Sequence, residues 1–438
     1  MKLMIDDFPL ATEDGPAPQP ERPAATPRSV WIVALLIVIA AVIVRVYPSA
    51  GFTGVGFDEA LYRDYVIKLD KVGLIGFPEI CQVYLEDQRK PETMTKLPPT
   101  RVFYIFTSWC WKRAEFGDAP PLVPHTIGFV EHDPALVALH RVACLFSILG
   151  VIAAGLAAWR MFGARSMLGT LALVGFAPVS IHMGQHALID GFFAFWATMC
   201  LWLLWENLRA PNDARRLAAL GACLALMVLT KENAFFVFVA LAGLVVANRW
   251  VKFGTVSSKL IFTGIAGPLV GVLLLVALAG GVGPFVEIYR LLVSKAETLT
   301  YAIRTGDGPW HRYLVDMLIV SPLVLLLAIG GFFTQLRKDR GYLFLALFVG
   351  LTYAVMCNVR YAMNLRYSTI WDLPLCALAA AQVGDLAKVF GRRHAFAATL
   401  IFTALCAYGL RQYLVFFADF KLYELVSEGL LRAVKILK

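Results

Sequence analysis

Long apolar runs dominate this chain of 438 residues, and they leave few folds open to it. They lie roughly at 30–47, 136–159, 168–184, 188–205, 217–230, 234–247, 260–283, 313–333, 342–357, 367–383 and 395–417. A helix crosses the hydrocarbon core of a bilayer with about 20 apolar residues, and it satisfies its backbone polar groups internally. Because 59% of the residues are hydrophobic, we predict an all-α polytopic membrane protein with about 11 transmembrane helices.

The stretch 217–247 is ambiguous, since it is either one broken span or a hairpin of two short helices that meet at Lys231-Glu232. Lysines and arginines between the runs decide the question. They cluster at Arg160 and Arg165, at Arg209, Arg215 and Arg216, at Arg249 and Lys252, at Arg337, Lys338 and Arg340, and at Lys388, Arg392 and Arg393. With a hairpin, all five clusters share one side with Arg22 and Arg28, as the positive-inside rule requires. We therefore predict a hairpin, a cytoplasmic N-terminus and an external C-terminus, and this topology, not nucleic acid, explains the net charge of +9.

The runs also divide the chain into segments of different character. Residues 1–28 are acidic and rich in proline, so we expect a disordered cytosolic tail and not a cleavable leader. The transmembrane domain then covers 29–417. It includes two external segments in which aromatic and charged residues mix, which predicts amphipathic helices in the membrane interface; these segments are 48–135 and 284–312. Residues 418–438 form an amphipathic C-terminal segment of the same kind.

Asp58 and Glu59 follow the first apolar run, where the first external segment begins. Only 16% of the residues are charged, so a charge beside the bilayer is a candidate for chemistry. One interpretation is structural, because acidic residues in the first turn of a helix are favoured by the helix dipole. The other is that the carboxylate acts as a general base at the mouth of a membrane cavity.

Polar residues from distant parts of the sequence share the external ends of helices in this topology. They are Asp58, Glu59, His186, Asp190, Lys231, Glu232, Arg360 and Arg366. Lys231 suits a phosphate as a point charge, and the planar guanidinium of Arg366 matches two phosphate oxygens. Structural interpretations stay open: Asp190 as a helix cap, Lys231 and Glu232 as a pair within a turn, and Arg366 as a surface residue. We predict that Asp58, Lys231 and Arg366 meet around one external pocket.

Short motifs occur in an order that resembles a known family. They are Asp58-Glu59, Pro98-Pro99, His140-Arg141, Arg160-Met161-Phe162-Gly163, Ala187-Leu188-Ile189-Asp190-Gly191-Phe192-Phe193, Leu229-Thr230-Lys231, Arg366-Tyr367 and Leu373-Pro374-Leu375. Over roughly residues 30–385 the pattern resembles the C-type membrane glycosyltransferase superfamily, in particular its protein O-mannosyltransferase and aminoarabinose (lipid A) transferase group. The chain departs from it at Gly184-Gln185, where Ser-Arg is common, and at Leu97, where His or Lys commonly precedes the prolines.

The resemblance implies an enzyme that moves a hexose or pentose from a polyprenyl-phosphate carrier to a lipid, glycan or protein acceptor. Its active site would face the external or periplasmic side of the plasma (inner) membrane. Asp58 would be the base of an inverting displacement, with Glu59 orienting the acceptor or a basic neighbour, while Lys231 and Arg366 would bind the donor phosphate. The remaining residues expected in the substrate cavity are His186, Asp190, Arg360 and Tyr367.

The main alternative is a flippase that transports lipid-linked sugars without transferring them. Such transporters have internal repeats and charges near mid-membrane, whereas eleven spans do not divide into halves and the polar residues here lie at external ends. No cofactor and no metal site are predicted, because the chain has neither a Gly-rich phosphate loop nor a metal-binding spacing; dependence on a divalent metal stays open. A disulfide between Cys81 and Cys110 also stays open.

Overall fold

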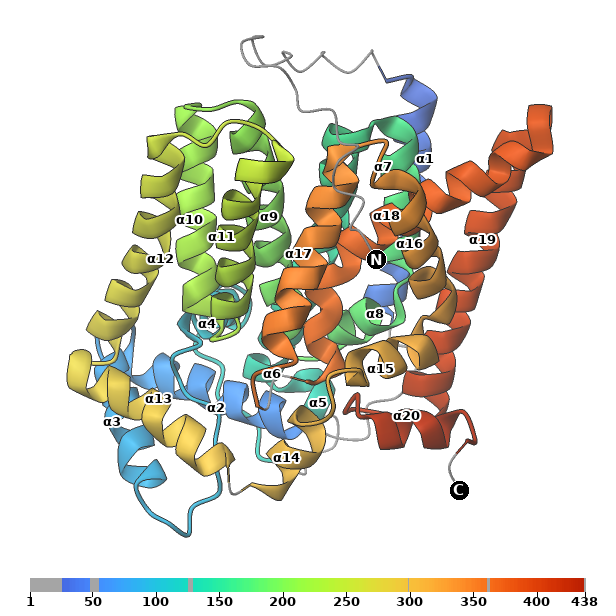
Figure 1. Cartoon of the computed structure of the whole chain (residues 1–438). Helices are drawn as coiled ribbons and strands as arrows, with labels where there is room; N and C mark the ends of the chain where they lie inside the picture. The colour runs from blue at the N-terminus through green and yellow to red at the C-terminus, as the bar shows by residue number, and fades with distance from the viewer. Residues whose placement is uncertain (1–25, 48–54, 125–128, 298, 361–362, 437–438) are drawn as a thin grey trace.

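The computed structural model is a bundle of helices with short helices packed across one end (Figure 1). It describes residues 26–47, 55–124, 129–297, 299–360 and 363–436, and no strand occurs within those ranges. The predicted all-α fold is confirmed. The predicted cytosolic tail, residues 1–28, lies outside the described residues except for its last three positions.

Every apolar run coincides with a helix or with a bent pair of helices. The bundle consists of α1 (Arg28–Val46), α6 (Pro134–Phe162), α7 (Ala164–Gly175), α8 (Pro178–Gln185), α9 (Ile189–Arg209), α10 (Ala214–Thr230), α11 (Ala234–Val251), α12 (Ser258–Leu278), α15 (Arg312–Val320), α16 (Pro322–Gln335), α17 (Arg340–Met356), α18 (Asp372–Ala387) and α19 (His394–Tyr413). The shorter helices outside these runs are α2 (Phe57–Val72), α3 (Phe77–Gln88), α4 (Val102–Phe116), α5 (Phe129–His132), α13 (Val282–Ala296), α14 (Thr300–Gly306) and α20 (Ser427–Ala433). Three further turns of 3-10 or π type are η1 (Leu365–Trp371), η2 (Lys388–Arg393) and η3 (Leu414–Asp419).

By length and composition, five helical stretches of the described chain can cross a membrane, or up to seven if each bent pair is one span. The bent pairs are α7 with α8, at 58°, and α15 with α16, at 118°. Both breaks precede a proline, Pro178 or Pro322, which cannot donate to the preceding turn and disfavours helix at the residue before it. The chain is thus a multi-pass membrane protein, while about 11 spans stays a prediction.

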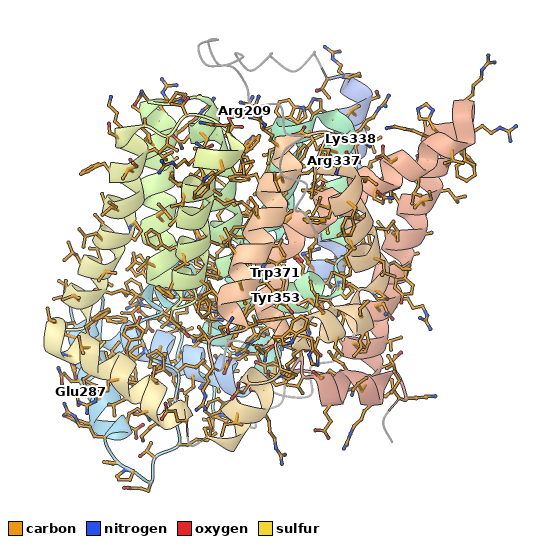
Figure 2. The ribbon with its side chains drawn as sticks, in the orientation of Figure 1. Arg209, Glu287, Arg337, Lys338, Tyr353 and Trp371 are labelled. Atoms are coloured by element: carbon orange, nitrogen blue, oxygen red, sulfur yellow. The ribbon has the colours of Figure 1, made fainter. Side chains whose placement is uncertain are left out.

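The hairpin predicted at Lys231 is present, since α10 ends at Thr230 and α11 begins at Ala234. Arg209, Arg337 and Lys338 lie at one end of the bundle, and Glu287 lies at the opposite end (Figure 2). Helices α2, α3, α13, α14 and α20 gather at the end away from the basic loops (Figure 1). This polarity agrees with the topology derived from the positive-inside rule.

A buried arginine satisfies the backbone where α7 breaks. Arg45, on α1, is 2% exposed. Its guanidinium donates to the carbonyl oxygens of Gly175 at 2.7 Å and Val174 at 3.3 Å, and to the hydroxyl of Ser147 at 2.9 Å. Free carbonyls are costly in hydrocarbon, so Arg45 allows the chain to bend before α8 and to direct His186 toward the end of the bundle where α2 lies.

Small residues let other helices approach closely. A Cβ atom at Gly267 of α12 would lie 2.8 Å from the carbonyl oxygen of Gly221, and one at Gly271 would lie 2.8 Å from that of Ala225. This Gly-x-x-x-Gly spacing is typical of close contacts between membrane helices. It fixes α12 against α10, whose end carries Lys231.

A fully buried carboxylate holds helix α2 on the end of the bundle. Asp133, at the start of α6, is 0% exposed. It accepts hydrogen bonds from Leu136 N at 3.0 Å, from Leu122 N at 2.9 Å and from Arg63 Nη2 of α2 at 2.8 Å. Because Arg63 lies little more than a helical turn beyond Asp58 and Glu59, this contact sets the height of the acidic pair above the bundle.

The topology can be tested with single cysteines at exposed positions, in a protein whose exposed Cys110 is replaced by alanine. We expect Glu92→Cys to react with a membrane-impermeant maleimide from the outside, and Arg215→Cys to react only from the inside. Both side chains are exposed in the folded protein, so labelling reports the side and not burial. Reaction of both cysteines from one side would contradict the topology.

Candidate functional site

The acidic pair lies at the N-terminus of α2, and its two members have different partners. Glu59 accepts from Gly56 N at 2.7 Å and from Ala187 N at 2.7 Å. Its Oε1 also lies 3.2 Å from His186 Nδ1 and 3.5 Å from His140 Nε2. Glu59 therefore joins α2 to α6 and to the turn between α8 and α9, which gives it a clear structural role.

The surroundings of Glu59 also act on its ionisation. Burial alone would raise the pKa of this carboxyl, but hydrogen bonds from His140 and His186 outweigh burial and hold the pKa well below its usual range. Glu59 is thus a carboxylate at neutral pH.

Asp58 faces a chain of alternating charges. Its Oδ2 accepts from Arg366 Nη1 at 2.8 Å. Arg366 Nε lies 3.7 Å from Asp190 Oδ2, and Asp190 Oδ1 accepts from Lys231 Nζ at 2.5 Å. The side chains of Asp58 and Arg366 are each 11% exposed, and those of Asp190 and Lys231 are 3% and 1% exposed. Asp58, Lys231 and Arg366 therefore belong to one chain of contacts, whereas the external pocket expected around them stays a prediction.

Tyr367 completes this cluster from η1. Lys231 Nζ lies 4.1 Å and Arg366 Cζ 5.4 Å from the centroid of its ring. The turn is fixed by Asn364, whose Oδ1 accepts from Arg366 N at 3.1 Å. An aromatic face next to two cations stabilises their charge without supplying another carboxylate. We call Asp58, Asp190, Lys231, Arg366 and Tyr367 the charge cluster.

A second ionic group beside the charge cluster escaped the sequence analysis. Arg101, at the start of α4, is 4% exposed and makes a bidentate contact with the carboxylate of Glu232. It also donates to the hydroxyl of Tyr62 on α2. Glu232 follows Lys231 in the hairpin tip, so Arg101 brings a third buried cation close to the charge cluster. Its position two residues after Pro98-Pro99 was the only signal in the sequence.

Arg360 was expected in the substrate cavity, but it is exposed and no contact joins it to the charge cluster. Its position after the end of α17 places it on the surface.

Cys81 is buried and Cys110 exposed, and they are not bonded to each other. Among the described residues, no group of three or more His, Cys, Asp or Glu side chains could hold a metal ion.

The C-terminal segment covers the start of α2. The ring of Tyr423 packs so closely on Gly56 that a Cβ atom there would lie 2.1 Å from it. The carbonyl oxygen of Tyr423 lies 3.2 Å from His182 Nε2, and its ring meets that of His186 edge-on at 5.2 Å. The sequence predicted an amphipathic segment here, but not its position against the acidic pair.

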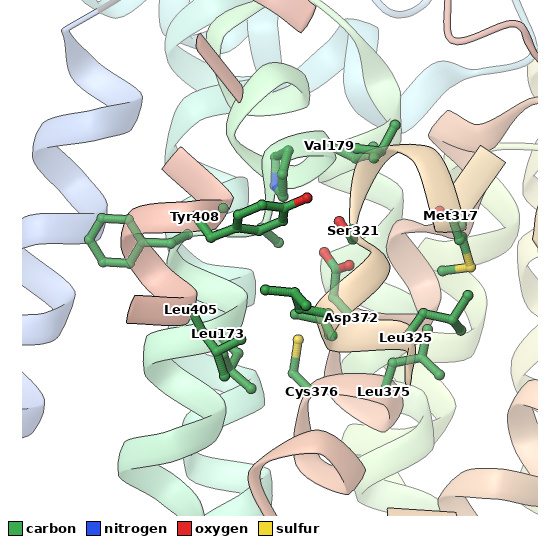
Figure 3. Close-up of a pocket in the computed structure, with 18 of the residues that line it drawn as sticks. Leu173, Val179, Met317, Ser321, Leu325, Asp372, Leu375, Cys376, Leu405 and Tyr408 are labelled. Atoms are coloured by element: carbon green, nitrogen blue, oxygen red, sulfur yellow. The ribbon is translucent and has the colours of Figure 1, made fainter. Parts of the chain in front are cut away.

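An apolar pocket lies away from the charge cluster, at the breaks between α7 and α8 and between α15 and α16 (Figure 3). Leu173, Leu325 and Leu405 line it, with the polar groups of Ser321 and Asp372. Its volume of about 60 Å³ corresponds to roughly two water molecules at the density of the liquid. It is therefore a packing gap at the bends and too small for a sugar.

Comparisons with known proteins find one matching family and several solved structures with a similar fold. Residues 121–286 match the family described as dolichyl-phosphate-mannose-protein mannosyltransferase. ArnT from Cupriavidus metallidurans in the apo state is similar with a TM-score of 0.53 and 14% identity, over 88% of this chain and 75% of that one. The oligosaccharyltransferase of Archaeoglobus fulgidus with zinc and sulfate has a TM-score of 0.56 and 13% identity, over 87% of this chain and 53% of that one. AglB from the same organism, with an inhibitory peptide and a dolichol-phosphate, has a TM-score of 0.55 and 13% identity, over 88% and 55%.

This chain thus spans about half the length of the oligosaccharyltransferase. A search of curated protein sequences gives no match. The matched family segment contains His140, His186, Asp190 and Lys231, whereas Asp58 and Arg366 lie outside it. The fold is that of ArnT and of the archaeal oligosaccharyltransferase, and residues 121–286 match the mannosyltransferase family. Both findings agree with the resemblance drawn from the sequence.

Replacing Glu59 tests its place in this arrangement. Glu59→Gln puts an amide NH₂ among backbone donors, so we expect a loss of about 1.5–3 kcal/mol in the free energy of unfolding near pH 7. A carboxyl whose pKa is lowered in the folded state contributes stability that is fully present above its unfolded pKa of about 4.5 and is lost as the pH falls from that value through the folded pKa. The difference between wild type and variant in the free energy of unfolding should therefore stay constant from pH 7 to about pH 5 and shrink as the pH falls from about 4.5 toward 2. A difference that stays constant below pH 4.5 would contradict the assignment.

Proposed function

We propose that this protein is an integral membrane glycosyltransferase that takes a sugar from a polyprenyl-phosphate carrier and transfers it to an acceptor at the external face. The observation that carries the proposal is the charge cluster. A carboxylate, Asp58, lies within hydrogen-bond distance of one buried cation, Arg366, and a second cation, Lys231, lies beyond Asp190. The fold and the mannosyltransferase segment support the same class of reaction.

The location of the cluster favours a lipid-linked donor. Lys231 and Arg366 lie at the ends of helices, where we expect the phosphate of a lipid carrier at the level of the headgroups. A flexible ammonium and a planar guanidinium provide a point charge and a fork of donors for its oxygens. The AglB structure similar to this chain contains a dolichol-phosphate, which agrees with a phosphate carrier of this kind.

The cluster is closed in this structure, because each cation is already paired with a carboxylate. We infer that the donor phosphate replaces the carboxylates as the partner of Arg366 and Lys231. This exchange would free Asp58 from its ion pair when the donor is bound. Each cation exchanges a carboxylate partner for a phosphate oxygen, so the positive charge of the buried cations stays compensated throughout.

The reaction then follows as a single displacement. Asp58 takes the proton of the acceptor hydroxyl as that oxygen attacks the anomeric carbon from the face opposite the phosphate. The bond between the anomeric carbon and the phosphate oxygen breaks, and its electron pair leaves with the polyprenyl phosphate. Lys231 and Arg366 stabilise the negative charge that develops there. The configuration of the anomeric centre is inverted, and no covalent enzyme intermediate forms.

Neighbouring residues position these groups. Glu59 holds the start of α2 against His186 and so fixes the direction of Asp58. Asp190 orients Lys231, and Arg101 clamps the hairpin tip through Glu232. The site would face the external side of the plasma (inner) membrane, with the N-terminus in the cytoplasm.

The direct test is an assay of the purified protein in nanodiscs with a panel of polyprenyl-phosphate-linked hexoses and pentoses. Transfer of radiolabelled sugar is measured into separate lipid, glycan and protein fractions of cell-envelope extract. We expect at least one donor to be consumed with release of polyprenyl phosphate. Movement of intact donor between leaflets without any transfer would favour a flippase instead.

Asp58→Asn tests the base. Asparagine keeps the shape of the side chain and its contact with Arg366, but it does not accept a proton at neutral pH. Turnover should fall by about two to four orders of magnitude, the usual range for loss of a general base. Asp64→Asn is the matched control, because Asp64 lies on the same helix with its side chain 60% exposed. A folded Asp58→Asn protein with near-normal transfer would refute the mechanism.

Arg366→Met and Lys231→Met test the phosphate site. Each removes a charge-assisted contact, so the donor should bind about 10- to 100-fold more weakly. Because Lys231→Met leaves Asp190 buried without its partner, the double change Lys231→Met with Asp190→Asn is measured beside it. Lys90→Met, at an exposed external position, controls for overall charge. Unchanged donor affinity in the folded variants would exclude these two residues from phosphate binding.

A further inference from the structure

The hydroxyl of Tyr423 is a polar group that the mechanism above does not use. Its oxygen is buried and has no hydrogen-bond partner in the part of the chain that the structure describes. A tyrosine hydroxyl that is removed from water usually finds a partner, because leaving it unpaired is costly. A group of this kind in a native structure requires an explanation, and a binding or catalytic role is one.

The ring of Tyr423 is held in place, so the hydroxyl is not a loose group that happens to point inward. The carbonyl oxygen of Tyr423 lies 3.2 Å from His182 Nε2, and the ring meets that of His186 edge-on at 5.2 Å. Leu425, two residues further on, is 1% exposed and anchors the segment in the core. The unpaired hydroxyl is thus a fixed feature of the closed site.

The hydroxyl lies at the start of α2, beside the acidic pair. A Cβ atom at Gly56 would overlap the hydroxyl oxygen, so this glycine leaves the space that the Tyr423 ring occupies. Burial raises the pKa of Tyr423 well above its usual range, and the charges of Glu59 and Asp58 raise it further, whereas Arg366 lowers it. The hydroxyl therefore keeps its proton at neutral pH and is a hydrogen-bond donor close to the proposed base.

The carboxylates next to this donor already have other partners. Glu59 accepts from two backbone N–H groups at 2.7 Å, and Asp58 Oδ2 accepts from Arg366 Nη1 at 2.8 Å. Arg366 Nε is a second donor without a hydrogen-bond partner in the described chain, and Asp190 Oδ2 lies 3.7 Å from it. Two donors around Asp58 are therefore unused, and a ligand that offers oxygen atoms would supply what they lack.

We propose that the Tyr423 hydroxyl binds the transferred sugar by donating a hydrogen bond to one of its oxygens. The inference rests on the function proposed above and adds a residue that distinguishes a loaded carrier from a bare one. In that function the phosphate binds Lys231 and Arg366, whereas Tyr423 lies at the acidic pair. A charged phosphate oxygen is disfavoured beside two carboxylates. A neutral sugar hydroxyl accepts from Tyr423 and has its own proton to donate to a carboxylate.

The sugar reaches the Tyr423 hydroxyl when the closed cluster opens. Donor binding as proposed above separates Arg366 from Asp58. The segment that carries Tyr423 is linked to the same arginine, because Glu424 Oε2 accepts from Asn364 Nδ2 at 3.2 Å and Asn364 Oδ1 accepts from Arg366 N at 3.1 Å. A shift of Arg366 toward the phosphate would therefore also move the ring that covers the start of α2.

Tyr423→Phe tests the proposal, because it removes the hydroxyl and keeps the ring. Equilibrium binding is measured with the full-length protein in nanodiscs, without an acceptor. The probes are polyprenyl phosphate that carries mannose, glucose or arabinose, and polyprenyl phosphate without a sugar. We expect at least one loaded probe to bind, and Tyr423→Phe to weaken its binding about three- to tenfold. Binding of the bare carrier should change by less than about twofold.

Thermal unfolding of the empty protein separates this role from a structural one. Because the hydroxyl has no partner to lose, the Tm of Tyr423→Phe should not fall below that of the wild type. Tyr342→Phe is the matched control, since Tyr342 is a buried tyrosine at the start of α17, next to the basic loops, and should leave both affinities unchanged. A lower Tm or a failure of Tyr423→Phe to fold would show that the hydroxyl serves the fold, and would overturn the proposal.

The binding results also separate this proposal from the proposed function. Unchanged affinity for every loaded probe, or equal weakening for loaded and bare carriers, would refute a contact with the sugar and leave the transferase reaction open. Loaded probes whose binding depends on Tyr423, but whose sugar is transferred to no acceptor, would refute the proposed function and keep the sugar contact. Binding of no polyprenyl-phosphate probe would overturn both.

Discussion

Charge compensation in a medium that does not solvate charge is the constraint on which this arrangement depends. Asp58, Arg366, Asp190 and Lys231 come from α2, η1, α9 and the tip of the α10–α11 hairpin, and they neutralise one another at the end of the bundle away from the basic loops. An unpaired ion at such a depth costs several kcal/mol. Each of these four parts of the chain is therefore stable only when the others are in place. The bidentate contact of Arg101 with Glu232 makes α4 depend on the hairpin tip in the same way.

In the proposed function the same pairs would also serve chemistry, because they can be exchanged. Replacing a buried ion pair by apolar residues often leaves stability unchanged, so the cluster is weak evidence for a purely structural role. A phosphate that entered it would find cations already oriented by Asp190, Asn364 and the ring of Tyr367. Little free energy would be needed to reorganise these cations, which is the condition under which fixed charges stabilise a transition state well.

Much of the architecture was predictable, because hydropathy and the positions of lysine and arginine are properties of the sequence alone. The hairpin at Lys231 and the meeting of Asp58, Lys231 and Arg366 both follow from the positive-inside rule, which brings distant helix ends to one face. The rule assigns a helix end to one side of the membrane, but it does not say which side chains touch there. It therefore led to the prediction that Arg360 lies in the substrate cavity, whereas the structure leaves that residue exposed. The roles of Arg101 and Tyr423 were not predicted, because the packing of helices distant in sequence determines their partners. Such packing leaves no pattern in the residues around Arg101 or Tyr423.

The contact between Asp58 and Arg366 joins residues that are 308 positions apart. During synthesis Asp58 is made early, whereas Arg366 follows only after most of the bundle has been made. Contacts this distant in sequence form late, since the intervening chain must first be arranged. A chain that stops short of η1, or inserts one helix the wrong way round, lacks the cation that orients the carboxylate. Such a chain does not complete the charge cluster, so incomplete chains in the membrane would lack the assembled site.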